Sequence, residues 1–459
     1  MKRLHGIVGL GLAGLGLAGL IATAAVGGQA LRQDAPAPAA GPAPVQGDAI
    51  SRAILPTTQA LLDGYVRDGK MPGIVAAFGV GDRPTLFVEA GRLATDATAA
   101  PATPDSLWRV YSMTKPVTAM AAMILIEEGR IGLDDPVSKY IPAFARMKVA
   151  TNPEASLASV PAVRPITIRM LLTHTSGITY NIIAKGALLK EYERLGILPA
   201  AVSASIEPMM RRTRPATLAA FADQVAKAPL IAQPGTAWNY SVGLDVMGRV
   251  IEVASGQPFD AFVNTRIFAP LKMTSSYWTV PPSEAGRLAT NYAWTGEVLA
   301  PLDPAATSVY LQPPSFPYGG AGLVMSARDY DRFLHMLADE GTLDGVRIMK
   351  PETVRLAMSN LLPAGVTFGG VGGATGGASA NAVPMGFGAG GSVYLADGPG
   401  GMPSKGTYGW GGAAGTVAFV DPVKKVRGTI MVNYFPADRW PVRQETVRAL
   451  AADLSRFRR

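Results

Sequence analysis

The sequence predicts an α+β fold in which one antiparallel sheet is assembled from both ends of the chain. Near the N-terminus, apolar runs at residues 73–80 and 85–90 flank a Gly-Asp-Arg turn. Near the C-terminus, apolar runs at 416–420 and 428–432 flank an Asp-Pro turn. Each pair of runs around a short polar turn is typical of a β-hairpin. We therefore expect both hairpins in the same sheet.

Helical patterns surround and separate these hairpins. Amphipathic helices are expected at 50–68 and 440–457, outside the two hairpins, and both should pack on one face of the sheet. The middle of the chain, about 116–315, shows few strand signals. It predicts a mostly helical region beside a sheet region that spans about 49–115 and 316–459, within one domain of residues 49–459.

The N-terminus has the pattern of a secretory signal. Lys2 and Arg3 precede a Gly/Ala/Leu-rich apolar run, and small residues suit cleavage near residue 30. Residues 1–30 are therefore interpreted as a signal peptide, followed by a Pro/Ala-rich linker at 31–48. An uncleaved segment would instead attach the protein to a membrane. Either interpretation predicts a periplasmic or secreted bacterial protein.

Composition excludes several classes of site. The 459 residues carry a formal charge of +8, but no basic run alternates with aromatic residues, so no nucleic-acid partner is expected. The chain has no cysteine, which excludes disulfides and a thiol nucleophile. Its three histidines are not spaced as metal ligands. We expect no metal and no cofactor.

A Ser-x-x-Lys sequence at Ser112 and Lys115 is the candidate catalytic centre. An apolar run at 119–126 follows and ends at Gly129, which predicts a buried helix. Pro116 is tolerated only in the first turn of a helix, so the helix should begin close to Ser112. Taken alone, the pattern fits equally a helix-capping serine with a surface lysine.

This spacing suits a serine nucleophile and its base. A serine hydroxyl attacks poorly until another group takes its proton, and a lysine can do so only as the neutral amine. Burial and the positive end of the helix favour that neutral form. A free backbone N–H at Ser112 can also stabilise a developing oxyanion.

Two further segments carry candidate site residues. Tyr240 precedes an apolar helix predicted at 244–254, where it can act beside Lys115 or pack the start of the helix. Before the C-terminal hairpin, Trp410, Gly411, Gly412 and Ala413 form a glycine-rich stretch. It fits either close approach of a substrate, with the Ala413 N–H as a second oxyanion donor, or an ordinary turn.

The other predictions concern residues outside these three segments. His174 is expected to make a structural hydrogen bond at a turn, and His335 to lie on the surface or packing face of a helix. Residues 364–391 are rich in Gly and Ala, which predicts a mobile loop that could lie over the site.

The three segments, in this order, resemble the serine β-lactamase and penicillin-binding superfamily. The pattern is most similar to class C β-lactamases and family VIII carboxylesterases, over about 50–455. The resemblance implies Ser112 as nucleophile, Lys115 as base, Tyr240 as its partner, and the Ser112 and Ala413 N–H groups as the oxyanion hole. It also implies a β-lactamase/transpeptidase-like fold. In that fold an antiparallel sheet flanked by helices forms an α/β sandwich, and a mostly helical domain lies beside it.

Two departures from the β-lactamase pattern bear on the substrate. β-Lactamases of this class have Tyr-x-Asn in the second segment, but Val242 stands at the Asn position here. Their third segment carries Lys or His before Thr-Gly, whereas this chain has Trp410-Gly411-Gly412, which resembles the esterases. A cation that pairs with a substrate carboxylate is worth about 1.5–3 kcal/mol. We therefore expect Trp410, Gly411 and Gly412 to bind an uncharged ester.

The leading hypothesis is a secreted serine hydrolase that cleaves small carboxylic esters through an acyl-enzyme on Ser112. The first alternative is a β-lactamase, D-Ala-D-Ala carboxypeptidase or D-amino-acid amidase. The β-lactamase or peptidase activity needs another cation near Trp410, for which Lys405 is the nearby candidate. The second alternative is a non-catalytic penicillin-binding or sensing module.

Overall fold

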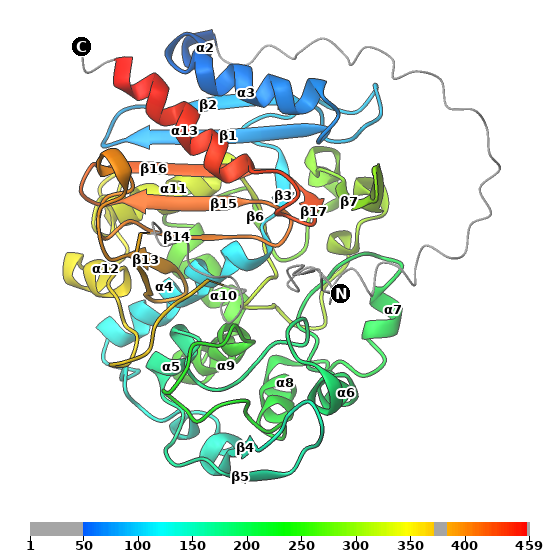
Figure 1. The fold of residues 1–459 in the computed structure, drawn as a ribbon, viewed down its shortest axis with the longest axis vertical. Helices are drawn as coiled ribbons and strands as arrows, with labels where there is room; N and C mark the ends of the chain where they lie inside the picture. The colour runs from blue at the N-terminus through cyan, green and yellow to red at the C-terminus, as the bar shows by residue number, and fades with distance from the viewer. Residues whose placement is uncertain (1–48, 371–382, 457–459) are drawn as a thin grey trace, which may run out of the picture.

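A seven-stranded antiparallel sheet forms the centre of the computed structural model, which describes residues 49–370 and 383–456 (Figure 1). Its strands, in order across the sheet, are β12 (Met385–Phe387), β13 (Ser392–Tyr394), β14 (Tyr408–Gly411), β15 (Val417–Asp421), β16 (Val426–Met431), β1 (Gly73–Val80) and β2 (Leu86–Gly91). The hairpins β1–β2 and β15–β16 were both predicted from sequence, and β1 pairs directly with β16. The prediction that the two ends of the chain share one sheet is therefore confirmed. The predicted signal peptide and linker lie outside the described residues.

Helices cover both faces of this sheet. The terminal helices α2 (Ala49–Ile54), α3 (Pro56–Arg67) and α13 (Val442–Ser455) share one face, and α11 (Ala327–Ala338) lies behind the other (Figure 1). Strand β1 is buried on both sides: Ile74 and Phe78 join the core under the terminal helices, whereas Val75 and Ala77 join the larger core on the α11 side. This double burial explains the continuous apolar run in its sequence.

The predicted N-terminal helix is divided into two. Helix α2 ends at Ile54 and α3 begins at Pro56, because a proline fits the first turn of a helix but cannot continue one. The closing helix was predicted at 440–457, and α13 occupies Val442–Ser455 of that range. Helices α3 and α13 pack against each other, as expected for one shared face.

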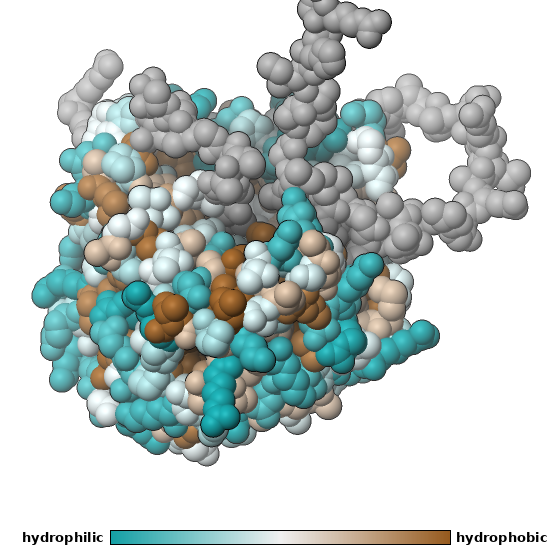
Figure 2. All heavy atoms as spheres, turned by 60° about the horizontal axis from the view of Figure 1, so that its bottom comes forward, coloured by the Kyte–Doolittle hydropathy of each residue, from teal (hydrophilic) through white to brown (hydrophobic). Residues whose placement is uncertain are grey.

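The helical region is arranged around two long helices, α4 (Thr114–Glu127) and α9 (Gly243–Ser255), which pack against each other. Helix α9 also contacts three shorter helices, α5 (Ile168–Leu172), α8 (Leu218–Val225) and α10 (Phe259–Val263). Helices α6 (Gly186–Leu195) and α7 (Glu207–Met210) lie further out (Figure 1). In the view of Figure 2, hydrophilic residues surround scattered hydrophobic ones on this end of the molecule.

Short strands complete the described structure. A three-stranded sheet contains β3 (Leu107–Arg109), β9 (Val324–Ser326) and β6 (Ser276–Tyr277), and another contains β17 (Tyr434–Phe435), β7 (Asn291–Thr295) and β8 (Val298–Asp303). Two ribbons are formed by β4 (Lys148–Ala150) with β5 (Ser159–Pro161) and by β10 (Thr342–Leu343) with β11 (Val346–Arg347). None of the helices in the described ranges has the length and apolar character needed to cross a membrane.

The interpretation of 364–391 as one mobile loop is wrong for part of that range. Residues 371–382 lie outside the described residues, but Met385–Phe387 forms the edge strand β12 and pairs with β13. The turn between these two strands packs on α4, since a Cβ at Gly390 would lie 2.7 Å from the carbonyl oxygen of Lys115. A close backbone approach explains the glycine here, whereas the sequence pattern suggested only flexibility.

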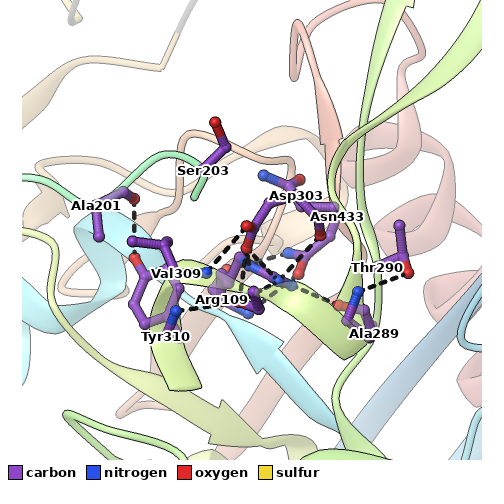
Figure 3. Close-up of polar contacts among 12 residues, drawn as sticks. Arg109, Ala201, Ser203, Ala289, Thr290, Asp303, Val309, Tyr310 and Asn433 are labelled. Carbon is purple, nitrogen blue, oxygen red and sulfur yellow. Dashed lines mark hydrogen bonds and ion pairs between the residues drawn. The ribbon is translucent and has the colours of Figure 1, made fainter. Parts of the chain in front are cut away.

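A buried ion pair fixes the strand that leads to the candidate nucleophile. Arg109, on β3, binds the carboxylate of Asp303 with Nη2 at 2.5 Å and Nε at 3.0 Å, and neither side chain is exposed (Figure 3). Ser308 donates to the same carboxylate at 2.7 Å. The Asn433 amide bonds both the N–H and the carbonyl of Arg109, each at 3.1 Å. The network thereby joins the strand before Ser112 to the segment that carries Asp303 and Ser308 and to the segment that carries Asn433.

We expect Asp303→Asn to destabilise the protein by about 3–5 kcal/mol, because it leaves the Arg109 guanidinium buried without a counter-charge. The measurement is the free energy of unfolding in urea. Asp134→Asn is the matched control, since Asp134 pairs with Arg169 at 2.7 Å but its side chain is 68% exposed, and its loss should cost about 1 kcal/mol or less. Equal effects of the two substitutions would contradict the structural role given to Arg109.

Candidate active site

A tight turn places Ser112 between β3 and α4. Tyr111 has a φ of +42°, a left-handed conformation that costs a non-glycine residue about 1–3 kcal/mol. The surroundings hold this residue: Asn291 Nδ2 donates to the Tyr111 hydroxyl at 3.0 Å, and the ring packs edge-on against Phe435. The turn allows β3 to end and α4 to begin within a few residues, with Ser112 at the junction.

Lys115 lies in the first turn of α4 and has no exposed surface. Its Nζ donates to Ser112 Oγ at 3.2 Å and to the carbonyl oxygen of Gly320 at 2.8 Å. The same atom lies 4.5 Å from the centre of the Tyr240 ring and 5.4 Å from that of Tyr180. The amine is therefore enclosed by aromatic rings and by two oxygen atoms.

Tyr240 completes a three-residue cluster with Ser112 and Lys115. It lies in the loop just before α9, and its hydroxyl donates to Ser112 Oγ at 2.6 Å. The side chain is almost fully buried and stacks on Tyr180 with ring centres 5.5 Å apart. The structure thus brings the three predicted catalytic residues within hydrogen-bonding distance of one oxygen atom. Such an arrangement can pass a proton from the serine to a neutral amine, directly or through the phenol.

The third segment lies against the turn that carries Ser112. A Cβ at Gly412 would lie 2.4 Å from the carbonyl oxygen of Val110, so only glycine permits this approach. Gly411 ends β14, and Ala413 follows in an exposed turn. Within the described residues, neither the Ser112 nor the Ala413 N–H donates a hydrogen bond to the protein. Both groups therefore remain available to an acceptor on a substrate.

Trp410 belongs to an aromatic group around Tyr240. Its ring centre lies 5.9 Å from that of Tyr240 and 5.1 Å from that of Phe387, on β12. Phe368 and Trp238 also join this group, with ring centres 4.8 Å apart. Sequence analysis missed Trp238, Phe368 and Phe387, because no spacing along the chain links these three residues. Trp410 and its aromatic neighbours thus form an apolar wall on one side of Tyr240, as expected from the replacement of a cation by Trp410.

His174 does not contact Ser112 but holds residues around it, in agreement with the predicted structural hydrogen bond. Its Nδ1 shares a hydrogen bond of 2.8 Å with Ser241 Oγ, and its ring packs on Tyr240 with centres 4.9 Å apart. Burial, and then the nearby charge of Lys115, hold the pKa of His174 well below its usual range. The imidazole is therefore neutral and helps to place Tyr240 by packing.

The fold brings together a second polar group that sequence spacing did not suggest. Potential ligand atoms of Asp82, His335 and Asp339 lie within 4.8 Å of one another, between the turn after β1 and helix α11. Asp82 is almost fully exposed, and His335 binds Asp339 at 3.1 Å. His335 is half-buried on its helix, which fits the prediction of a surface or packing residue, and this group lies outside the cluster around Ser112.

Asp245 is the residue of the site that sequence analysis missed most clearly. It lies in the first turn of α9 without exposed surface, and its Oδ1 accepts the Gly320 N–H at 2.9 Å. Burial raises the pKa of Asp245 to about 7, although the charge of Lys115 acts in the opposite direction. In the sequence, an acidic residue in the first turn of a helix suggests only an exposed favourable interaction with the helix dipole.

Comparisons with known proteins agree with this geometry. The Beta-lactamase family model matches residues 58–453. Esterase EstB of Burkholderia gladioli is 32% identical over 391 residues, covering 82% of this chain and 89% of EstB. Protein Rv1367c of Mycobacterium tuberculosis (strain ATCC 25618 / H37Rv) is 34% identical over 348 residues, covering 72% and 78%. The solved structure of EstCE1, a hydrolase with promiscuous acyltransferase activity, superposes with a TM-score of 0.69 at 25% identity, covering 88% of this chain and 100% of EstCE1.

An antiparallel sheet flanked by helices, with a Ser-x-x-Lys sequence at the start of a buried helix, defines the class of serine β-lactamase and penicillin-binding folds. The predicted resemblance and fold class are therefore confirmed. The chain belongs to the Beta-lactamase family, and it is a hydrolase of that fold.

Proposed function

We propose that the protein is a serine hydrolase that cleaves small, uncharged carboxylic esters through an acyl-enzyme on Ser112. The observation that carries this proposal is the position of Ser112 Oγ, 3.2 Å from the buried Lys115 amine and 2.6 Å from the Tyr240 hydroxyl. A hydroxyl in contact with a buried amine, which as the neutral base can take its proton, and with a phenol that can relay that proton is equipped for nucleophilic attack.

In the proposed mechanism, Ser112 Oγ attacks the ester carbonyl while its proton passes to the neutral Lys115 amine, directly or with the Tyr240 hydroxyl as a relay. The Ser112 and Ala413 N–H groups stabilise the oxyanion of the tetrahedral intermediate. As this intermediate collapses, the leaving alcohol takes up the proton and the acyl group stays on Ser112. Water then attacks the acyl-enzyme, which releases the acid and restores the Ser112 hydroxyl.

The surroundings of the site favour an ester over a β-lactam. Trp410 presents an indole where a β-lactamase would hold the substrate carboxylate with a cation, and Phe387 and Tyr240 extend that apolar surface. Lys405, the alternative cation, is exposed and lies in the turn before β14, whereas Gly411 is at the other end of that strand. EstB, named an esterase, agrees with this preference.

A series of p-nitrophenyl esters tests the proposal. We expect short acyl esters to be cleaved and Ser112→Ala to lower kcat by on the order of a thousand-fold or more, because the nucleophile is lost. Ser283→Ala, at an exposed serine, is the matched control and should leave the rates unchanged. Full turnover by Ser112→Ala would contradict the proposal, and a persistent acyl adduct without turnover would favour a penicillin-binding or sensing module.

Substitution of Trp410 tests the substrate class. We expect Trp410→Lys to lower KM for a cephalosporin by roughly 10–100-fold, since a cation paired with the carboxylate contributes about 1.5–3 kcal/mol. Trp410→Phe, the control without a cation, should not change this KM in the same direction. If the unaltered enzyme hydrolysed nitrocefin as fast as its best ester, the β-lactamase alternative would replace the esterase.

We also infer that the protein is exported from a bacterial cytoplasm, on the strength of the signal pattern in residues 1–30. Fractionation of cells that express the full chain with a C-terminal tag tests this inference. A periplasmic or secreted product whose mass corresponds to cleavage near residue 30 is expected, and Lys2→Glu with Arg3→Glu should reduce export. A full-length product in the membrane fraction would indicate an uncleaved anchor, and one confined to the cytoplasm would refute export.

A further inference from the structure

Asp245 contacts the catalytic cluster through a single residue. Its Oδ1 accepts the Gly320 N–H at 2.9 Å, and the Gly320 carbonyl in turn accepts the Lys115 amine at 2.8 Å. Both polar backbone atoms of Gly320 are therefore used to connect a carboxyl on α9 to an amine on α4. Neither Asp245 nor Lys115 has exposed surface, so water does not screen the interaction of the two groups.

The second oxygen of this carboxyl lacks a hydrogen-bond partner in the part of the chain that the structure describes. It faces the backbone of Gly320, where a Cβ would lie 2.5 Å from Oδ2. A fully ionised carboxylate in this position would have one unsatisfied oxygen away from water, which is costly. The carboxyl therefore favours its neutral form, and its pKa of about 7 means that its charge changes near neutral pH.

Few other titratable groups face this pair. Around the Lys115 amine lie the phenols of Tyr180 and Tyr240 and the neutral imidazole of His174. The remaining charged side chains of α9 and of the helices packed on it are exposed or half-buried, namely Glu127, Arg169, Asp223, Arg249, Glu252 and Asp260. Among the described residues, Asp245 is thus the acidic group placed to act on Lys115 without screening.

We propose that Asp245 is a positioning residue of the esterase: through Gly320 it holds the Lys115 amine against Ser112, and its charge sets the pH range in which that amine can accept the Ser112 proton. This inference rests on the proposed function of the site. An ionised Asp245 favours the ammonium form of Lys115, which cannot accept a proton. A neutral Asp245 removes that restraint on proton transfer from Ser112.

The pH profile of kcat/KM for a p-nitrophenyl ester tests the proposal. In Asp245→Asn the side-chain oxygen can still accept the Gly320 N–H, but the negative charge is absent. We expect the acidic side of the kcat/KM profile to move about one pH unit lower, while the maximal kcat/KM stays within about threefold of that of the unaltered enzyme. Asp245→Ala also removes the acceptor, so its maximal kcat/KM should fall by tenfold or more.

Asp223→Asn is the matched control, because Asp223 is an exposed carboxylate on α8, a helix packed against α9. It should leave the acidic side of the profile unmoved. A folded Asp245→Asn variant whose rate falls equally at every pH, with the acidic side of the profile in place, would show a purely structural role and overturn the proposal.

A measurement without substrate separates this inference from the proposed function and does not need Asp245→Asn to fold. In the unaltered protein labelled with carboxyl-¹³C aspartate, one aspartate signal should titrate near pH 7. In Lys115→Ala the same signal should titrate at higher pH, because the cation that favours the carboxylate is gone. The absence of such a signal, or its indifference to Lys115, would overturn the proposal even if the ester assays established Ser112 as the nucleophile.

Discussion

The structure depends on keeping one amine away from water. A lysine loses several kilocalories per mole of hydration when it is buried, so each neighbour of Lys115 must compensate for that loss or favour the neutral amine. Gly320 supplies a carbonyl oxygen, Ser112 a hydroxyl, and Tyr240 and Tyr180 the faces of two rings. Because these groups come from segments far apart in the chain, the amine can be enclosed only when the whole domain is folded.

The order of the elements in the chain follows from that requirement. Strand β3 and helix α4 deliver Ser112 and Lys115, and the strained Tyr111 between them is held by Asn291, from β7. Helix α9 packs along α4 and brings the loop with Tyr240 to the same place. The end of β14 closes the other side, where Gly412 touches the carbonyl of Val110. The sheet made from the two chain ends therefore forms a fixed surface against which the helical region positions Ser112.

The sequence was sufficient wherever function depends on local spacing. The two hairpins, the helix after Ser112 and the positions of Lys115 and Tyr240 could all be inferred from patterns a few residues long. Asp245 could not, because its burial is a property of the contact between α4 and α9, and the carbonyl of Gly320 has no signature at all. Phe368 and Phe387 were missed for the same reason, since these aromatic residues are far from Tyr240 in the sequence and approach it only in the folded protein. The strand at Met385–Phe387 was missed because the glycines around it suggested a flexible loop. In the structure these glycines allow close packing of the backbone.

The proposed preference for an uncharged substrate follows from the same amine. A substrate carboxylate held close to Lys115 would favour the ammonium form and so oppose the step in which Ser112 loses its proton. A site that binds an anionic substrate therefore benefits from a separate cation that takes up the substrate charge. In the third segment of this chain that position carries the indole of Trp410, packed against Tyr240 and Phe387. A neutral ester brings no charge close to Lys115. Whether the amine carries a proton then depends only on the buried groups of the protein, among them Asp245.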